Sequence, residues 1–276
     1  MKEIIGYLGP EGSFSHEAAI ILQKKMRDKA KLKAYSSYSL AEALFENKVQ
    51  KAVLPIENSL DGQVNWVIDL LASDFTFFIE QEIVLTIVQN LLGFGKISDI
   101  KIIYSHPSAL GQCRQFLKKL DVQIKDVDST SEAVKIVAKT KNLEVAAIGT
   151  LLASKIYQVP VIKKAVNDKF NNQTRFIVLG KEKRRRNQKN KTSLIFLIPD
   201  KPGALVRVLE IFDVLDINMK TLFSRPLKTK LGEYMFFVDI EGHQNERKVS
   251  VALETLKKKV KLLKILGSYP VSVSEI

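Results

Sequence analysis

Hydroxyl and amide side chains gather in short polar segments that adjoin apolar runs of the chain. The segment NNQTRF places Thr174 beside the permanent positive charge of Arg175 and the ring of Phe176, directly before the apolar run IVLG. A guanidinium can bind a carboxylate through two parallel hydrogen bonds, and a hydroxyl can hydrogen-bond a reacting oxygen. These residue types suit the binding and polarisation of an organic anion.

Further candidates carry a hydroxyl, amide or carboxylate near the end of an apolar run. They are Ser13, Glu57, Asn58, Ser59, Ser105, Gln112, Ser129, Thr130 and Thr150. Hydroxyl residues at such positions are also common helix N-caps, and we expect Ser13 or Ser15, Ser105, Ser129 or Thr130, and Thr150 to be caps. The shared placement of these residues indicates a site, whereas any one of them indicates only a cap.

Spacing argues against several kinds of active site. The three histidines, His16, His106 and His243, lie far apart in the sequence, and no pair has the spacing of metal ligands. The glycine-rich GPEGSF matches neither the Walker A nor the dinucleotide fingerprint, and no Ser–His–Asp order is present. We expect no metal and no cofactor, with Cys113 a small buried side chain. Two classes stay open: a binder of organic anions, or an enzyme that needs no cofactor.

The first 180 residues repeat an apolar strand, a loop with a hydroxyl residue, and a helix. Strands are predicted over 3–9, 99–105, 124–130 and 143–149, followed by helices over 10–26, 106–120, 131–140 and 150–157. Strands that alternate with helices indicate a parallel α/β sheet. The carboxyl ends of such strands face the ligand crevice, where helix starts with unpaired N–H groups favour anions.

Two segments are predicted to cross between lobes. Residues 75–93 read as one long crossing strand, and the chain returns near 166–180. Two crossings predict two α/β lobes with a cleft between them. The NNQTRF segment would then lie on the hinge side of that cleft.

The pattern changes after a basic segment at 181–191. Residues 192–270 read strand, helix, strand, strand, helix, strand, which is the ferredoxin-like βαββαβ unit. We therefore expect a catalytic or binding domain over 1–180, a basic linker over 181–191 and a separate domain over 192–276.

Composition describes an ordinary globular chain of 276 residues, with 46% hydrophobic and 26% charged residues. The net charge is +13, but 181–191 alone holds seven basic residues and one acidic residue. A basic linker and a solvated helix face account for this charge, so we expect no nucleic-acid partner. No apolar run has the length of a membrane helix or a signal peptide, and one cysteine is typical of a reducing compartment. We expect a cytoplasmic protein without a membrane partner.

The motifs, taken in order, resemble one family. GYLGPEGSFSHEAA, LPIENSLDGQV, YSHPSALGQC, STSEA, AAIG and NNQTRF are similar to motifs of prephenate dehydratases, and the residues around PGALVRVL and SRP resemble their ACT regulatory domain. The resemblance covers nearly the whole chain. It implies a two-lobed, periplasmic-binding-protein-like α/β catalytic domain that converts prephenate to phenylpyruvate in L-phenylalanine synthesis. Because the chain starts at GYLGPEG, it resembles the monofunctional form.

The resemblance also implies roles for individual residues. Thr174 matches the family's essential threonine, which we expect to hydrogen-bond the departing hydroxyl, and Arg175 is expected to bind a carboxylate. Expected donors to substrate oxygens are Ser13, Asn58, Ser105 and Gln112, with Glu57 a candidate for proton handling. Further expected substrate contacts are Phe14, Ser59, Ser129, Thr130, Thr150 and Phe176.

The C-terminal domain resembles ACT domains that bind L-phenylalanine between two subunits. Expected effector contacts are Gly203, Ala204, Leu205, Val206, Asn218, Ser224, Arg225 and Pro226. Phe223 departs from the family pattern, which has Glu before SRP, and this leaves the strength and sign of regulation open. A homodimer or homotetramer is implied. An arogenate dehydratase and a non-catalytic binding sensor stay as alternatives.

Overall fold

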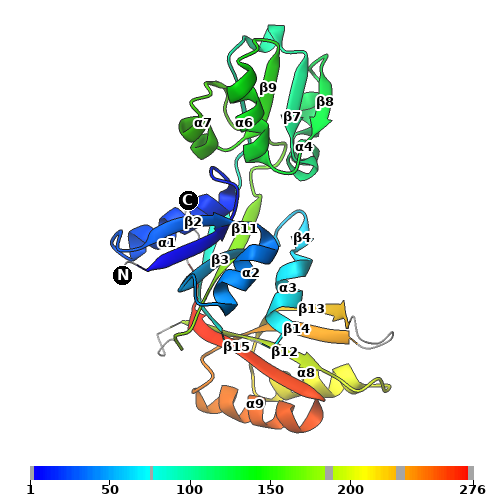
Figure 1. Ribbon diagram of the computed structural model, residues 1–276. Helices are drawn as coiled ribbons and strands as arrows, with labels where there is room; N and C mark the ends of the chain where they lie inside the picture. The colour runs from blue at the N-terminus through cyan, green and yellow to red at the C-terminus, as the bar shows by residue number, and fades with distance from the viewer. Residues whose placement is uncertain (1–2, 75–76, 184–188, 228–233, 273–276) are drawn as a thin grey trace. The chain divides into compact units, whose positions relative to one another are not determined.

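The computed structural model describes residues 3–74, 77–183, 189–227 and 234–272. These residues form two compact units (Figure 1). The first takes in the chain up to Val64 together with Ile83–Phe176. The second takes in Asn65–Glu82 and the chain from Ile177 to the end of the described residues. Residues 184–188 of the predicted basic linker lie outside the described residues.

One sheet contains the N-terminal strands. Its order is β2-β1-β3-β11-β5, and β4 pairs with β3. The pairs β1–β2 and β1–β3 are parallel, as the alternation of strands and helices predicts. The elements are β1 (Ile4–Leu8), α1 (Phe14–Lys25), β2 (Lys31–Tyr35), α2 (Ser37–Phe45), β3 (Lys51–Asn58), β4 (Gly62–Gln63), β5 (Phe78–Thr86) and β11 (Gln173–Gly180).

A second sheet of the first unit has the order β10-β6-β9-β7-β8. The pairs β7–β8 and β7–β9 are parallel, whereas β6 runs antiparallel to β9 and to β10. The elements are β6 (Asn90–Gly93), the short 3₁₀ helix η1 (Ile97–Asp99), β7 (Ile102–Ser105), α4 (Pro107–Gln112), α5 (Arg114–Leu117), β8 (Gln123–Asp126), α6 (Thr130–Thr140), β9 (Val145–Gly149), α7 (Leu151–Tyr157) and β10 (Val161–Lys163). The predicted single strand over 75–93 is therefore two strands, β5 and β6, which belong to different sheets.

Helix caps agree with the prediction at three positions and differ at one. Ser13, Ser129 and Thr150 each accept a hydrogen bond from a backbone N–H in the first turn of the helix that follows. Ser105 does not cap a helix. Because Pro107 occupies the first helical position of α4, the cap moves to His106, whose Nδ1 accepts from the Ser108 N–H.

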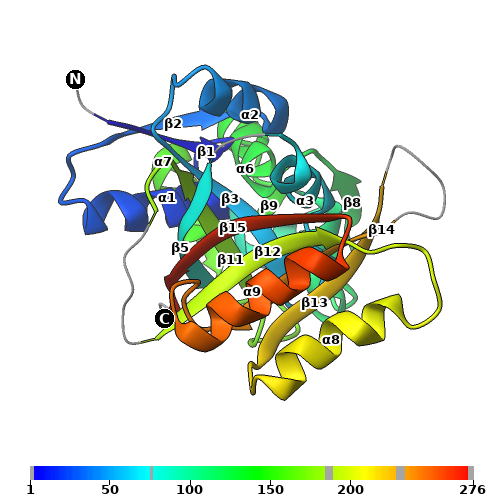
Figure 2. The same cartoon turned by 90° about the horizontal axis from the view of Figure 1, so that it is seen from below.

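The second unit contains the predicted βαββαβ fold. Its elements are β12 (Asn190–Leu197), α8 (Ala204–Val214), β13 (Met219–Pro226), β14 (Tyr234–Glu241), α9 (Arg247–Lys259) and β15 (Leu262–Pro270). The sheet order is β13-β14-β12-β15, and α8 and α9 lie side by side on one of its faces (Figure 2). Their apolar stripes pack on the sheet around Phe196, Phe212 and Val238.

The second unit also contains residues 65–82, which lie far before the βαββαβ fold in the sequence. Helix α3 (Asn65–Ala72) buries Val67, Ile68 and Leu71, and each such side chain contributes about 1.5–3 kcal/mol when fully buried. Gly267 of β15 has a φ of +148°, and a Cβ there would lie 2.5 Å from the Ile79 carbonyl oxygen, so only glycine permits this close approach. Residues 65–82 thus pack as part of the βαββαβ unit.

A search of the described helices finds none that is both long and apolar enough to cross a membrane.

Candidate active site

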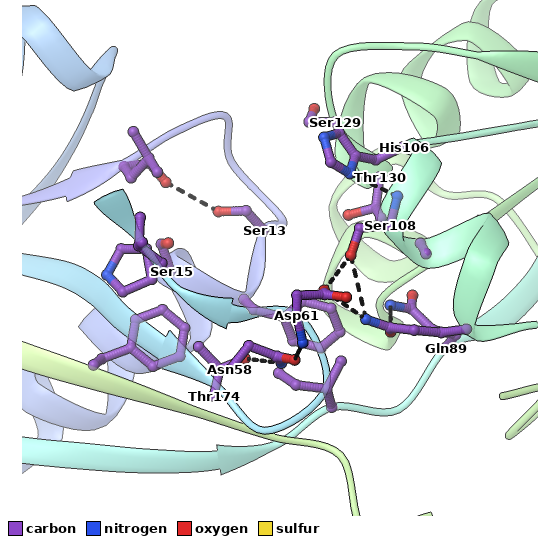
Figure 3. Close-up of a pocket in the computed structure, with 18 of the residues that line it drawn as sticks. Ser13, Ser15, Asn58, Asp61, Gln89, His106, Ser108, Ser129, Thr130 and Thr174 are labelled. Carbon is purple, nitrogen blue, oxygen red and sulfur yellow. Dashed lines mark hydrogen bonds between the residues drawn. The ribbon is translucent and has the colours of Figure 1, made fainter. Parts of the chain in front are cut away.

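A pocket of about 350 Å³ lies in the first unit (Figure 3). Its walls come from the β1–α1 loop, the β3–β4 turn, and residues at the starts of α4, α6 and β11. Eight of the thirteen residues predicted for the active site line it: Ser13, Phe14, Asn58, Gln112, Ser129, Thr130, Thr174 and Phe176. The fold therefore brings together residues from five separate sequence motifs.

Asn58 fixes the direction of the hydrogen bond at Thr174. The Asn58 Oδ1 accepts from the backbone N–H groups of Leu60 (2.8 Å) and Asp61 (2.9 Å). This leaves Nδ2 as the donor to Thr174 Oγ1 and to Asn172 Oδ1, both at 2.8 Å. Since Thr174 Oγ1 already accepts, its own hydrogen is available, and no acceptor for it is found within the described chain. Thr174 is thus held as a donor at the pocket wall.

A chain of side-chain hydrogen bonds joins four residues of the pocket lining. The Asp61 Oδ2 accepts from Ser108 Oγ and, at 3.0 Å, from Gln112 Nε2. The Gln112 Oε1 in turn accepts from Gln89 Nε2 at 3.3 Å. These contacts join the β3–β4 turn to α4, as the bond between the labelled Ser108 and Asp61 shows in Figure 3. They also set the orientation of the Gln112 amide.

Arg175 lies on the opposite face of β11 from the pocket and pairs with Glu57 of β3. Side chains alternate along a strand, so Thr174 and Phe176 face the pocket and Arg175 faces away. The Arg175 Nη2 lies 3.4 Å from Glu57 Oε2, and the Arg175 side chain is 10% exposed. Neither residue lines the pocket, and this ion pair connects β11 to β3.

Ser59 joins the β3–β4 turn to the segment NNQTRF. Its N–H donates to the Gln173 carbonyl oxygen at 2.8 Å, and its Oγ accepts from the Gln173 N–H at 2.9 Å. Ser59 does not line the pocket. Its contacts hold the two segments that carry Asn58 and Thr174 in register.

Ser105 and Thr150 are buried outside the pocket. The Ser105 Oγ donates to the Ile148 carbonyl oxygen at 2.8 Å, which links β7 to β9. The Thr150 Oγ1 donates to the Gly12 carbonyl oxygen at 2.6 Å while it caps α7. Their hydroxyl hydrogens are used inside the protein, so neither is placed as a donor into the pocket.

Several pocket residues were missed by the sequence reasoning: Asp61, Gln89, His106, Ser108 and Asp128. Asp61, His106 and Ser108 lie inside the quoted motifs LPIENSLDGQV and YSHPSALGQC, where only their neighbours were selected. No sequence pattern marks Gln89 as a pocket residue, because it lies in the break between β5 and β6, which the pattern of apolar residues did not reveal.

The charged side chains of the described pocket lining are acidic. Among the described lining residues, Asp61 and Asp128 are acidic and no lysine or arginine is present. Burial raises the pKa of Glu17 to about 7, partly opposed by a hydrogen bond from the Leu152 backbone. Burial also raises the pKa of Cys113 to about 12, so its thiol stays protonated and behaves as the predicted small apolar side chain.

A search of the described residues finds no group of three or more His, Cys, Asp and Glu side chains that could hold a metal ion.

The predicted effector residues divide into two groups. Gly203, Ala204, Leu205 and Val206 line a pocket of about 220 Å³ at the start of α8. Asn218, Ser224, Arg225 and Pro226 do not line it. Arg225 of β13 instead forms a two-pronged contact with Asp69 of α3. Phe223 stacks on Phe237 with ring centroids 4.8 Å apart, so the departure from the family pattern fills an apolar position.

A two-lobed α/β unit with a polar pocket, joined in one chain to a βαββαβ domain, defines the class of this protein. Sequence models of known families specify it further: the prephenate dehydratase model matches residues 5–184 and the ACT domain model matches residues 192–257. The chain belongs to the prephenate dehydratase family. Membership confirms the predicted family, fold class and reaction class, a lyase that acts on prephenate.

Individual relatives agree over nearly the full length. The prephenate dehydratase of Lactococcus lactis subsp. cremoris is 37% identical over 280 residues, which cover 99% of each chain. The crystal structure of prephenate dehydratase from Arthrobacter aurescens in complex with L-Phe has a TM-score of 0.89 at 27% identity, covering 99% of this chain and 93% of that one. A structure described as GqqA, a novel type of quorum quenching acylase, has a TM-score of 0.87 at 26% identity, covering 98% of each chain.

Proposed function

We propose that this protein converts prephenate to phenylpyruvate with release of carbon dioxide and water. The observation that carries the proposal is Thr174, which Asn58 holds as a hydrogen-bond donor at the pocket wall. As the carboxylate leaves as carbon dioxide, its C–C bonding pair makes the ring aromatic and expels the allylic oxygen. That oxygen takes up a proton and leaves as water. A fixed donor stabilises the charge that develops on the departing oxygen.

Thr174 stabilises the departing oxygen through a hydrogen bond and does not transfer the proton, because a threonine hydroxyl is a poor acid. Glu57 was the predicted proton-handling residue, but it pairs with Arg175 and does not line the pocket. The same placement supports a positioning role for Arg175, through β3 and β11, over the direct carboxylate contact that the resemblance implies. Ser59 and Ser105 likewise support the site from outside the pocket.

Substrate binding relies on neutral donors and on one helix start. Gln112 offers a polar group, and Ser129 and Thr130 bring the positive end of the α6 dipole to the pocket. Ser13 lines the pocket, but its Oγ already donates to the Leu8 carbonyl oxygen at 3.2 Å. Phe14 and Phe176 supply apolar surface for the ring. Weak neutral donors suit a substrate that must lose a carboxylate, since tight ground-state binding of the departing group would slow its loss.

The second unit supplies regulation. We place the catalytic domain over 1–180, the linker over 181–191 and the ACT domain over 192–276, with L-phenylalanine as the effector at the Gly203–Val206 pocket. The support is the lining of that pocket and the L-Phe complex of the Arthrobacter aurescens relative. ACT domains of this kind act in pairs, so the protein forms a homodimer or homotetramer. Its compartment is the cytoplasm, in keeping with a single cysteine.

The experiment is a phenylpyruvate-formation assay on the full chain, without added cofactor, with and without L-phenylalanine. Prephenate should be turned over with saturation kinetics. Arogenate, tested beside it, should give the lower kcat/KM; the reverse ranking would make the protein an arogenate dehydratase. Tight binding of prephenate without turnover would contradict the enzyme proposal and favour the binding sensor.

A further inference from the structure

Asp61 occupies the donors that α4 presents to the pocket. The Ser108 Oγ and Gln112 Nε2, one helical turn apart on α4, both donate to Asp61 Oδ2. The amide of Gln112 cannot turn its Nε2 elsewhere without losing the bond that its Oε1 accepts from Gln89. A carboxylate therefore already sits where a hydroxyl and an amide N–H converge.

The charge of Asp61 matters because the pocket is short of cations. No described lining residue is a lysine or arginine, so no cationic side chain of the lining pairs with Asp61 or with an incoming dianion. A substrate carboxylate that reached Ser108 and Gln112 would meet the Asp61 carboxylate at the same donors. The two anions exclude each other by charge and by space.

The Asp61 side chain can leave these donors without disturbing the reacting centre. Its backbone N–H donates to Asn58 Oδ1, and this contact involves the main chain only. Rotation of the Asp61 carboxylate away from α4 leaves two bonds of Asn58 intact. Its Oδ1 still accepts from the Leu60 N–H, and its Nδ2 still donates to Thr174 Oγ1. Exchange of one carboxylate for another is therefore a local event.

We propose that Asp61 is a specificity-determining residue, an internal competitor that a substrate carboxylate must displace from Ser108 and Gln112. This inference rests on the proposed dehydratase function. The release of Asp61 from α4 sets the apparent affinity of the enzyme for its substrate, because every binding event includes that release. It also disfavours ligands that lack a carboxylate, which gain no α4 donors in exchange.

The test is Asp61→Asn, compared with the matched variant Asp128→Asn. Asp128 is a second exposed carboxylate of the pocket lining, with no side-chain bond to α4 among the described contacts. For Asp61→Asn, KM for prephenate should fall by about threefold to tenfold, the value of one hydrogen bond, with kcat within twofold of wild type. For Asp128→Asn, a smaller fall should disappear at high salt. In a Ser108→Ala background, where Gln112 alone still donates to Asp61, Asp61→Asn should lower KM by less than in the wild type.

An unchanged or higher KM for Asp61→Asn would overturn the inference, as would an equal, salt-sensitive fall for Asp128→Asn. Isothermal titration with prephenate gives a second readout that needs no turnover. If the wild type binds but does not turn over prephenate, the dehydratase proposal fails. In that case the Kd for prephenate tests the Asp61 inference: a lower Kd in Asp61→Asn supports it, and an unchanged or higher Kd overturns it.

A separate observation concerns Arg225, which was predicted to contact the effector. Its Nη2 donates to Asp69 Oδ2 at 2.8 Å, and its Nε donates to Asp69 Oδ1. The same segment is also tied to the βαββαβ unit by Lys191, whose Nζ lies 2.5 Å from Glu82 Oε2. The two ends of residues 65–82 are thus each held by an ion pair to the regulatory fold.

Helix α3 continues directly from the pocket wall. Gly62, Gln63 and Val64 line the active-site pocket, and Asn65 begins α3. A movement of α3 with the regulatory unit would act on this wall through the main chain, without any further contact. The pair of Arg225 and Asp69 joins β13 to α3.

The structure assigns to Arg225 and Asp69 the transmission of effector binding to the pocket wall, which makes them positioning residues. This second inference also rests on the proposed function. The chain contains one tryptophan, Trp66, and it lies on α3, so its fluorescence reports on this helix. L-phenylalanine does not absorb where tryptophan is excited selectively.

The test compares wild type, Asp69→Asn and the control Lys220→Gln. Lys220 lies on β13, the strand of Arg225, and forms an exposed pair with Glu241 of β14. On addition of L-phenylalanine, wild type and Lys220→Gln should change both Trp66 emission and kcat/KM. Asp69→Asn should bind L-phenylalanine within threefold of wild type by titration, yet lose most of both responses. A wild-type response in Asp69→Asn, loss of L-phenylalanine binding in Arg225→Lys, or a silent wild type would each overturn the inference.

Discussion

Replacing Thr174 by valine should lower kcat for prephenate by about 10²- to 10³-fold, the cost of removing one preorganised donor to a developing negative charge. KM should change less than threefold, because the hydroxyl acts on an oxygen that becomes charged only as the C–O bond breaks. Valine has nearly the shape of threonine, and the site is only 9% exposed, so packing on the strand is retained. Steady-state kinetics and a thermal melt of each variant measure the two effects separately.

Thr174→Ser is the matched control, since it keeps the hydroxyl and the bond from Asn58 Nδ2. It should retain kcat within about tenfold, because a serine side chain is less restricted at χ1 than threonine. A valine variant with nearly wild-type kcat would remove Thr174 from the mechanism. A large rise in KM at unchanged kcat would make it a binding residue instead.

Local pattern predicted the four strand–helix repeats of the first 180 residues, since each repeat carries its own signal, but β2, α2 and β10 were not predicted. The failures have identifiable causes. The break that separates β5 from β6 lies inside FIEQEIVLTIVQNLLG, where apolar residues occur on both sides of the break, and such a pattern does not mark where the chain leaves one sheet for another. Gln89 lies in that break and lines the pocket, so its place in the site could not be predicted from the sequence.

The sequence already indicates which side chains of β11 share a face, because side chains alternate along a strand. Thr174 and Phe176 are two residues apart in β11 and share the pocket face, whereas Arg175 between them must point the other way. The period of two therefore argued against a joint role for Thr174 and Arg175 at one substrate group. The resemblance to a family named the right motif, and strand geometry divides that motif into a pocket face and a supporting face.

Tertiary contacts decided what the sequence pattern left undetermined. The pairing of Asp69 with Arg225 joins residues 156 positions apart, and no local signal marks either as the other's partner. Likewise, the position of Asn58 beside Thr174 depends on Ser59 and Gln173, which bond two distant segments together. Motif order predicted that these segments share a site, but which atoms meet follows only from the fold.

Asn58→Asp should be the second most damaging change, with a loss in kcat of about 10²-fold, again the cost of one lost donor to the developing charge. The substitution keeps the shape and the oxygen that accepts from Leu60 and Asp61. It replaces the Nδ2 donor by an oxygen, so the Thr174 hydroxyl turns to donate to the new carboxylate and no longer points at the substrate. The fold should survive, because Nδ2 of the buried Asn172 has no hydrogen-bond partner in the described chain and can donate after an amide flip.

Two comparisons separate this reversal of the hydrogen bond from simple loss of a contact. Asn58→Ala removes the donor but leaves the Thr174 hydroxyl able to rotate toward substrate, so its kcat should exceed that of Asn58→Asp. In Asn58→Asp, kcat should rise as the pH is lowered toward the usual carboxyl pKa of about 4, since the protonated acid can donate to Thr174 again. The wild type and Asn58→Ala should lack this rise. If Asn58→Asp is the more active variant, or its kcat has the wild-type pH profile, then Asn58 does not set the direction of the Thr174 hydrogen bond.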